Sequence, residues 1–376
     1  MSLVLKEVSS KKDLKDFIAF PYKLYKDNKY FIPPLRIDEM KTLNKKSNPA
    51  FDFCESKYWL VYNDDRIVGR VAGIINTKFN DKFDKKSARF GWIDFEDDEN
   101  ISLLLFNTVE QWAVSKGMTS LHGPLGFTDM DGEGMLIEGY EEISTLGSIY
   151  NYPYYRNHIE KLGYEKDIDW IEFRVKIVSS TPEKIARIAE IALQRNKLHV
   201  PVFKKAKDML PYARDIFYLI NETYKDLYGF VELTDKQIDS YVKQYFSFIR
   251  PEYLPIVLDE NNKLAAFGIT MPSLNNALQK INGKLLPFGF LSILKEMKKS
   301  KSLDLYLTAV RTDLQNKGVN ALLIDQINKV CIKNGIQFVE TNRELESNEK
   351  VQAQWKLYNA RQHKRRRCYK KVLGKS

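Results

Sequence analysis

One stretch of the sequence combines residue types and spacing that could bind a phosphate-bearing ligand. Residues 303–310 (LDLYLTAV) are typical of a β-strand, residues 315–318 of a tight loop, and residues 318–333 of a helix. The backbone N–H groups of such a loop, together with the partial positive charge at a helix N-terminus, form a site for a pyrophosphate. Gly318 would let the backbone approach the ligand closely. The same pattern also fits an ordinary connection from strand to helix with a glycine at its turn.

This stretch resembles motif A of the GNAT superfamily of acyl-CoA N-acyltransferases. The resemblance rests on Val310, Gln315 and Gly318, whereas Asn320 stands where the motif has glycine or alanine. It implies that acetyl-CoA or another acyl-CoA binds here as co-substrate. In that family, backbone groups after a bulge in the preceding strand and an asparagine that opens a later helix also contact the cofactor. The residues that the resemblance assigns to the cofactor are Thr308, Ala309, Val310, Gln315, Asn316, Lys317, Gly318, Val319, Asn320, Ala321 and Asn348.

Acyl transfer from a thioester to an amine requires a base for the nucleophile and an acid for the departing thiolate. Asp304 stands where some family members carry a glutamate base, and Glu340 on the next expected strand is a second candidate. A carboxylate beside an apolar pocket would have a raised pKa suited to this role. Asp304 fits equally well a solvated position near the start of a strand. Trp355 stands where the family often has a tyrosine acid, so Tyr358 is the nearest phenol. This chemistry requires no metal.

The elements that position these residues occur twice along the chain. In each half, strands alternate with helices after a hairpin, which predicts an α/β (α+β) protein with two GNAT-like domains. Each domain is expected to be a mixed, mostly antiparallel sheet flanked by helices. Thr181-Pro182-Glu183 is typical of a helix start, and it places the domains at residues 1–178 and 179–376.

The first half resembles the family more faintly, and we expect it not to bind CoA. Residues 158–166 (HIEKLGYEK) are similar to the closing signature of the family. Residues 96–100 (EDDEN) contain four carboxylates at the position of the phosphate loop, where they would repel a pyrophosphate. The glycine-rich residues 123–134 could line a substrate cleft or hold a hard cation through their carboxylates. A plain surface loop is the simpler interpretation.

The charge of the chain is concentrated at one end. The net charge is +10 and the pI is near 9.1, which is typical of proteins that bind nucleic acid or a membrane surface. Eight of the ten excess charges lie in residues 361–376, which contain no acid. We expect this tail to be the last strand of the second domain. A tail that binds RNA is the alternative.

Composition indicates a reducing compartment. The cysteines Cys54, Cys331 and Cys368 are too few and too far apart for a disulfide framework, and no Cys/His spacing fits a zinc site. The sequence shows neither a secretory leader nor an apolar run that approaches ~20 residues. A cytoplasmic protein without a membrane partner is therefore expected.

These features predict a transferase, namely an N-acyltransferase that moves an acetyl or other acyl group from acyl-CoA to an amine of a small molecule or peptide. Two alternatives stay open. A tRNA-dependent aminoacyl transferase of the kind that extends peptidoglycan bridges would use aminoacyl-tRNA in place of CoA. A binding module that kept the fold without the chemistry would account for Asn320, Trp355 and Ile159, which depart from the family pattern.

Overall fold

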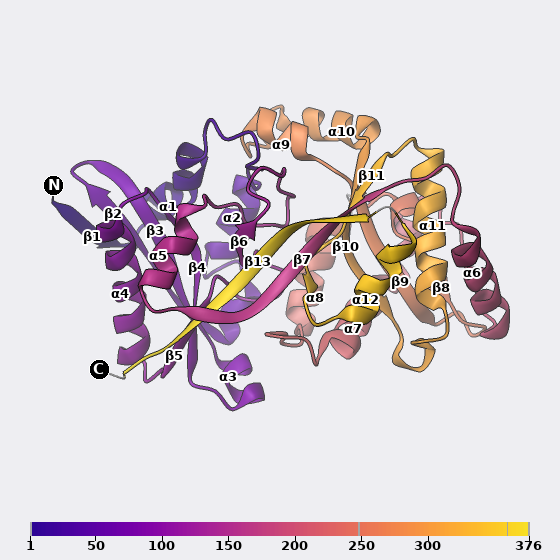
Figure 1. Cartoon of the computed structure of the whole chain (residues 1–376), viewed down its shortest axis with the longest axis horizontal. Helices are drawn as coiled ribbons and strands as arrows, with labels where there is room; N and C mark the ends of the chain where they lie inside the picture. The colour runs from indigo at the N-terminus through magenta and orange to yellow at the C-terminus, as the bar shows by residue number, and fades with distance from the viewer. Residues whose placement is uncertain (1, 247–248, 359, 375–376) are drawn as a thin grey trace. The chain divides into compact units, whose positions relative to one another are not determined.

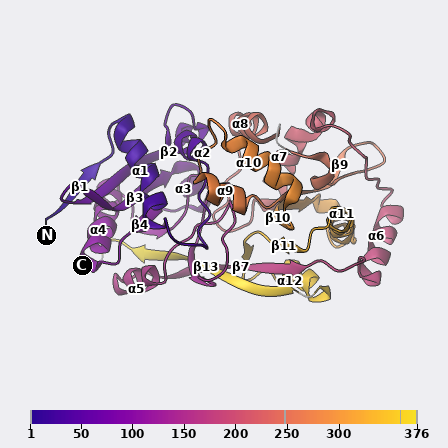
Figure 2. The same ribbon diagram turned by 90° about the horizontal axis from the view of Figure 1, so that it is seen from above.

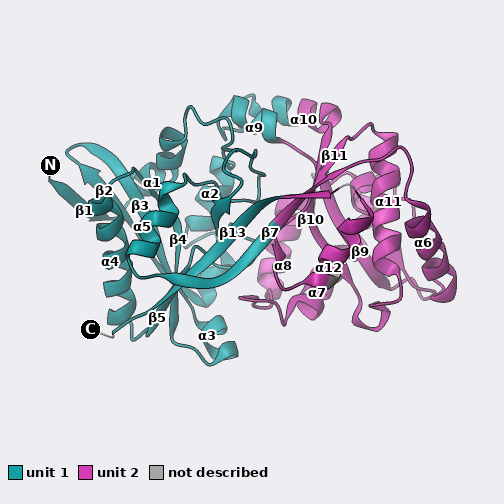
Figure 3. Ribbon diagram, viewed as in Figure 1, with its two compact units in different colours: residues 1–171, 275–293, 363–376 teal, residues 172–274, 294–362 magenta. Residues whose placement is uncertain are grey.

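The computed structural model describes residues 2–246, 249–358 and 360–374. The chain forms two compact units, which are coloured separately in Figure 3. Unit 1 comprises Met1–Ile171, Asn275–Ile293 and His363–Ser376, and unit 2 comprises Glu172–Leu274 and Leu294–Gln362. The units are therefore not the continuous segments 1–178 and 179–376 that the sequence suggested. A helical segment from the second half and the C-terminal residues belong to unit 1.

Unit 1 contains a mostly antiparallel sheet flanked by helices (Figures 1 and 2). The strands lie in the order β1 (Leu3–Glu7), β2 (Cys54–Asn63), β3 (Arg66–Asn76), β4 (Ser87–Phe95), β5 (Ser120–Gly123) and β13 (Ala360–Val372), and β6 (Met135–Glu138) also pairs with β13. The pairing of β4 with β5 is parallel. The helices are α1 (Lys11–Leu24), α2 (Arg36–Leu43), α3 (Thr77–Phe83), α4 (Glu99–Ser115), α5 (Tyr154–Lys161) and α9 (Asn275–Ile281).

Small residues in β3 allow α4 to pack closely on the sheet. A Cβ atom at Gly69 would lie 2.9 Å from side-chain atoms of Ile101 and Leu105, and one at Gly73 would lie 2.7 Å from the Trp112 ring. The helix buries these three side chains because they recur at helical spacing on one face. Larger residues at the two glycines would push α4 away from β3.

The C-terminal strand β13 is fixed in unit 1 by a buried carboxylate. Asp169 in β7 (Glu165–Lys176) accepts hydrogen bonds from Arg367 Nε at 2.8 Å and Arg367 Nη2 at 3.0 Å, and from Arg365 Nη1 at 3.1 Å. Burial opposes ionisation of Asp169, but the two guanidinium groups outweigh it, and the pKa of Asp169 is lowered. Since β13 pairs with β5 and β6, the expectation that the tail is a strand of the second domain is wrong.

Unit 2 also contains mixed, mostly antiparallel strands flanked by helices. Its strands lie in the order β7, β11 (Phe338–Glu340), β10 (Ser302–Val310), β9 (Leu264–Pro272) and β8 (Ile256–Leu258), with the short β12 (Glu344–Leu345) also paired to β7. Its helices are α6 (Glu183–Arg195), α7 (Leu210–Tyr224), α8 (Asp235–Tyr245), α11 (Val319–Lys333) and α12 (Glu349–Ala353), and α10 (Gly289–Lys299) begins in unit 1 and ends in unit 2. Within the described ranges, every helix is too short or too polar to cross a bilayer.

Strand β10 changes the face that it presents to α11 partway along its length. Its register with β9 shifts between Leu305 and Leu307, so that Tyr306 is an extra, bulged residue. Before the bulge, Leu305 packs in the core cluster that contains residues of α11, whereas Leu307 packs in the cluster that contains residues of α7. Beyond the bulge, Val310 returns to a cluster with α11 residues. The strand therefore carries the bulge that the resemblance implies for it, and the structure places this bulge at Tyr306.

We expect Asp169→Asn to destabilise unit 1, because it removes the buried anion that contacts both Arg365 and Arg367 and leaves them the longer contacts with Glu138 at 3.5 Å and Glu160 at 3.9 Å. The expected loss in the free energy of unfolding at neutral pH is about 3 kcal/mol. The pKa of Asp169 is lower in the folded state than its ordinary value of 3.8. The ionised Asp169 side chain therefore stabilises the folded state fully at pH values above 3.8, and this stabilisation is lost as the pH falls through the pKa of the folded state. Urea unfolding of both proteins at several pH values measures the difference.

The matched control is Glu99→Gln, which neutralises a carboxylate in an exposed ion pair with Lys161. It should change the free energy of unfolding by less than about 1 kcal/mol. Equal effects of the two substitutions would show that Asp169 does not hold β13.

Candidate functional site

A cavity lies in unit 2 where two parallel strands separate. Strands β10 and β11 pair at three positions only, from Ser302 opposite Phe338 to Asp304 opposite Glu340. Beyond these positions a cavity of about 70 Å³ opens, which is mostly apolar. The lining comes from β7, β10, β11, α11, α12 and the turn that follows α12: Val175, Ile177, Leu305, Thr308, Asn320, Leu323, Ile324, Ile327, Asn328, Val339, Val351, Gln354, Trp355 and Tyr358.

The bulge in β10 shapes the separation of the strands. The side chain of Asn342, just after β11, donates a hydrogen bond of 2.6 Å from Nδ2 to the carbonyl oxygen of the bulged Tyr306. On β10 itself, the Thr308 carbonyl accepts a bond of 2.9 Å from the Tyr224 hydroxyl of α7. Side chains therefore satisfy backbone groups that a continuous β10–β11 ladder would pair. The first amide after the bulge is that of Leu307, one residue before the predicted Thr308–Val310.

The predicted phosphate loop connects this strand to α11. The side chain of Gln315 donates a hydrogen bond of 3.2 Å from Nε2 to the backbone carbonyl of Val310. Asn316 and Gly318 both have left-handed backbone conformations, with φ of 60° and 83°. A Cβ atom at Gly318 would lie 2.8 Å from the Ile188 side chain in α6, so glycine is needed there for two reasons. Among the described residues, no side chain caps the N-terminus of α11.

The two predicted bases lie together, on the other face of the sheet from the cavity. Asp304 and Glu340 are buried register partners on β10 and β11, and they alternate with the cavity-lining Leu305 and Val339. Glu340 Oε1 is 3.4 Å from Arg174 Nε. Asp304 Oδ2 accepts a bond of 3.5 Å from the Tyr306 hydroxyl, whose pKa is raised by burial and by the Asp304 charge.

The predicted acid, Tyr358, lines the cavity. Its side chain is 8% exposed, and its hydroxyl has no hydrogen-bond partner among the described residues. Burial raises the pKa of Tyr358 to about 12, so the phenol keeps its proton at neutral pH. A protonated, unpaired phenol at a cavity wall is able to donate a hydrogen bond to a bound ligand.

A further carboxylate, which the sequence did not single out, lies beside the cavity wall. Glu344 Oε1 accepts a hydrogen bond of 2.7 Å from the indole Nε1 of Trp355, which lines the cavity. Its second oxygen, Oε2, is buried and has no hydrogen-bond partner within the described ranges. Burial raises the pKa of Glu344 to about 7, and the bond from Trp355 opposes this only in part. Such a carboxyl group can exchange a proton at neutral pH.

The other cofactor candidates have local structural roles. Asn348 caps α12, because its Oδ1 accepts a bond of 3.4 Å from the Val351 amide. Thr308 is exposed at the open edge of β10, whereas Ala309 and Val310 are buried. Asn320, in the first turn of α11, reaches the cavity lining. Asn320 therefore lies both directly after the predicted phosphate loop and in the wall of the cavity.

The acidic loop of unit 1 is used for internal contacts. Asp98 caps α4 by accepting a bond of 2.8 Å from the Asn100 amide, and Asp97 pairs with His158 Nε2 at 2.9 Å. In the glycine-rich segment, Asp131 Oδ2 accepts bonds from the amides of Phe127 and Thr128 at 2.8 and 3.1 Å. These carboxylates stabilise loops and helix ends. That unit 1 does not bind CoA stays a prediction.

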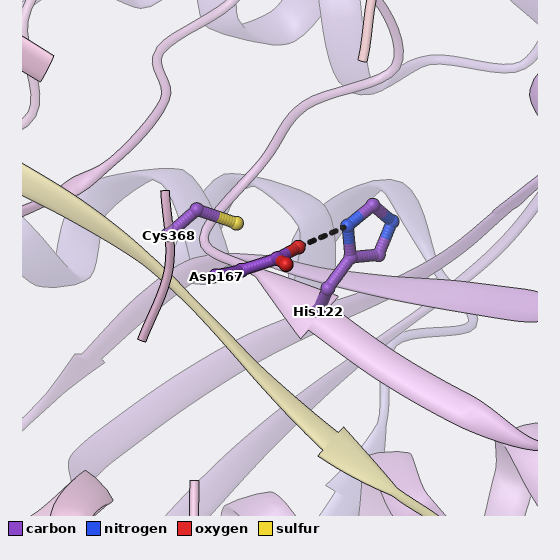
Figure 4. A group of neighbouring side chains, drawn as sticks. All are labelled: His122, Asp167 and Cys368. Atoms are coloured by element: carbon purple, nitrogen blue, oxygen red, sulfur yellow. Dashed lines mark ion pairs between the residues drawn. The ribbon is translucent and has the colours of Figure 1, made fainter. Parts of the chain in front are cut away.

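A second group of side chains in unit 1 has the composition of a metal site. His122, Asp167 and Cys368 bring one ligand atom each within 4.8 Å of one another (Figure 4). Lys370 pairs with Asp167 at 3.0 Å, and burial together with the charge of Arg89 lowers the pKa of His122 to about 3. Since these cations would repel a metal ion, we assign no metal to this group.

Comparisons with known proteins agree with the architecture. No family model matches the chain. Among curated proteins, it is 28% identical over 371 residues to protein YghO of Escherichia coli, covering 97% of this chain and 94% of that one. It is 27% identical over 297 residues to a bacterial ceramide synthase of Caulobacter vibrioides, covering 77% of this chain and 75% of that one.

Solved structures show the fold over the whole chain. A tandem GNAT protein from the clavulanic acid biosynthesis pathway matches with a TM-score of 0.57 and 13% identity, covering 100% of both chains. A GCN5-related N-acetyltransferase from Sphaerobacter thermophilus matches with a TM-score of 0.53 and 9% identity, covering 98% of this chain and 95% of that one. The predicted fold class is confirmed. The chain has the tandem-domain fold of the GNAT superfamily.

Proposed function

We propose that the protein is an acyl-CoA-dependent N-acyltransferase whose reaction takes place in unit 2. The observation that carries the proposal is the apolar cavity between the separating strands β10 and β11, which begins at the N-terminus of α11. A CoA thioester has a pyrophosphate, a pantetheine arm and an acyl chain. The loop, the open strand edge and the cavity offer a complementary site for each of these parts.

The cofactor would bind along β10. The amides of Gln315, Lys317 and Ala321 donate to the carbonyls of Thr312, Leu314 and Gly318. The amides of Asn316 and of residues 318–320 would therefore hold the pyrophosphate, with the exposed Lys317 side chain adding positive charge. The edge of β10 from Leu307 to Val310 would pair with the amides of the pantetheine arm, and Asn348 would contact this arm from α12. Acetyl-CoA or a longer acyl-CoA satisfies these contacts equally.

Glu344 would act as the base and Tyr358 as the donor to the departing sulfur. The carboxylate takes a proton from the acceptor ammonium, directly or through water, and the free amine attacks the thioester carbon. The C–S bond of the tetrahedral intermediate then breaks and the second proton on nitrogen passes to the departing sulfur, so that the products are an amide and the CoA thiol. The Tyr358 phenol stabilises the thiolate by a hydrogen bond. Asp304 and Glu340 are the alternative bases, and they would reach the amine from the other face of the sheet.

The relative from Caulobacter suggests a further class of acceptor. Ceramide is an N-acyl lipid, and an enzyme that makes it acylates the amine of a long-chain base. An amine acceptor agrees with the proposed reaction, so a long-chain base belongs in the acceptor panel beside small amines and peptides. The sequence analysis left open that the donor is an aminoacyl-tRNA. In that case we expect the protein not to bind CoA.

Binding of CoA is tested by blocking the cavity. Asn320→Trp places a large ring at an exposed position of the lining, and we expect it to weaken CoA binding by at least about tenfold through loss of shape complementarity. Isothermal titration calorimetry with CoA and acetyl-CoA measures the affinity. The control is Lys333→Trp, an exposed position of the same helix outside the lining. Absence of heat from the unmodified protein at millimolar CoA would refute the proposal for this cofactor.

The base is tested by pH dependence. Because the pKa of Glu344 is about 7, the carboxylate is ionised above this pH and protonated below it. We expect the rate of acyl transfer to fall as the pH drops below about 7, and Glu344→Gln to lower kcat by roughly 10²-fold or more. The control Glu349→Gln, an exposed site in α12, should keep the profile. If Asp304→Asn or Glu340→Gln removes the pH dependence while Glu344→Gln keeps it, the base is on the other face.

The donor is tested by Tyr358→Phe, which removes one hydroxyl from the cavity wall. We expect kcat to fall by about tenfold while the Kd for CoA stays the same, because the hydrogen bond forms to the developing thiolate. Release of free thiol, followed with a thiol reagent, measures the rate. Tyr218→Phe, on the exposed face of α7, is the control. An unchanged kcat would exclude Tyr358 as the donor.

A further inference from the structure

A cluster of large apolar side chains is exposed between helices α9 and α10. Leu286 and Phe288 in the connecting loop are 70% and 72% exposed, and Phe290 and Leu291 in the first turn of α10 are 40% and 53% exposed. Leu294, one turn further along the same helix, is 50% exposed. We name these five residues the apolar ridge. So many neighbouring exposed apolar side chains are unusual in a water-soluble protein and indicate an interaction surface.

The ridge is exposed although its segment is firmly held. In unit 1, Gly283 accepts a hydrogen bond of 3.0 Å from the Arg36 amide, and Gln279 Nε2 donates one of 3.1 Å to the Phe31 carbonyl. Within α10, Ile293 and Met297 are buried at a spacing of four residues. Since one face of α10 is already buried, the apolar side chains on its outer face are not needed for packing.

Positive charge surrounds the ridge. Residues 280–301 contain six lysines and one glutamate. All six lysines are exposed, and four of them follow the ridge in the last turns of α10 and just beyond it: Lys280, Lys284, Lys295, Lys298, Lys299 and Lys301. Apolar side chains beside a polybasic stretch match the two layers of a membrane surface, namely acyl chains beneath anionic headgroups.

We infer that the loop and helix over residues 284–299 form a docking surface for anionic membranes. The apolar ridge inserts at the boundary between headgroups and acyl chains, and the lysines contact the headgroup phosphates. The helix lies at the surface and does not cross the bilayer, which agrees with its length of 11 residues. This inference revises the expectation from sequence that the protein has no membrane partner, and it does not depend on the proposed acyl transfer.

The test is sedimentation of the full chain with vesicles of phosphatidylcholine alone and of phosphatidylcholine mixed with anionic phosphatidylglycerol. We expect binding to the anionic vesicles, weakened by salt, and at least about tenfold weaker binding for Leu286→Ser combined with Phe288→Ser. Val202→Ser, at a lone apolar residue that is 91% exposed, is the control. The pair Lys298→Glu and Lys299→Glu should also weaken binding, whereas Lys184→Glu with Lys204→Glu should do so much less.

A direct readout of insertion is Phe288→Trp. The fluorescence of the introduced indole should shift to shorter wavelength with anionic vesicles and be quenched by lipids brominated on their acyl chains. Sedimentation that is equal with both vesicle types, or unaffected by the serine substitutions, would overturn the inference. So would an emission spectrum of this variant that vesicles leave unchanged. Self-association through the ridge without vesicle binding would also overturn it, and would assign the surface to a second copy of the chain.

Discussion

The site in unit 2 depends on the bulge at Tyr306. One extra residue in β10 turns the following side chains over, so that Leu305 and Leu307 pack on opposite faces of the sheet. The strand then diverges from β11 after three paired positions, and the cavity lies in the gap. Removing the bulge would extend the ladder and close the space that we assign to the cofactor. The side-chain amide of Asn342 helps to keep the gap open by binding the Tyr306 carbonyl.

The carboxylates around this gap differ in the groups that contact them, and these contacts decide which of them can act as a base. Asp304 and Glu340 lie beside each other on one face, where Tyr306 and Arg174 contact them. Glu344 is held by a neutral indole, without a cation to stabilise its charge among the described residues, and its pKa rises to about 7. A carboxylate without a paired cation is better suited to take a proton from a substrate than one already neutralised by arginine. This contrast favours Glu344 over Glu340 as the base, and the position of Asp304 on the face away from the cavity favours Glu344 over Asp304.

The positive charge of the C-terminus has a structural use. Arg365 and Arg367 bind Asp169, Lys370 pairs with Asp167, and Lys371 pairs with Glu110. These contacts lie inside unit 1 and hold a strand that comes from the end of the chain. Exposed positive charge beside an exposed apolar surface is found elsewhere, in the lysines that follow the apolar ridge. Net charge alone could not have distinguished the two locations.

The sequence by itself determined the features that depend on neighbouring residues: the strand, the glycine loop and the helix of residues 303–333, and the repeated α/β pattern. The tertiary structure alone decided which side chains meet. The contact between Glu344 and Trp355, the assignment of β13 to unit 1 and the face on which Asp304 lies follow from pairing between distant segments. The resemblance implied a bulge in the strand LDLYLTAV, but the alternating run does not show where it lies, because a bulge is set by pairing with the partner strand and leaves the sequence periodicity unchanged.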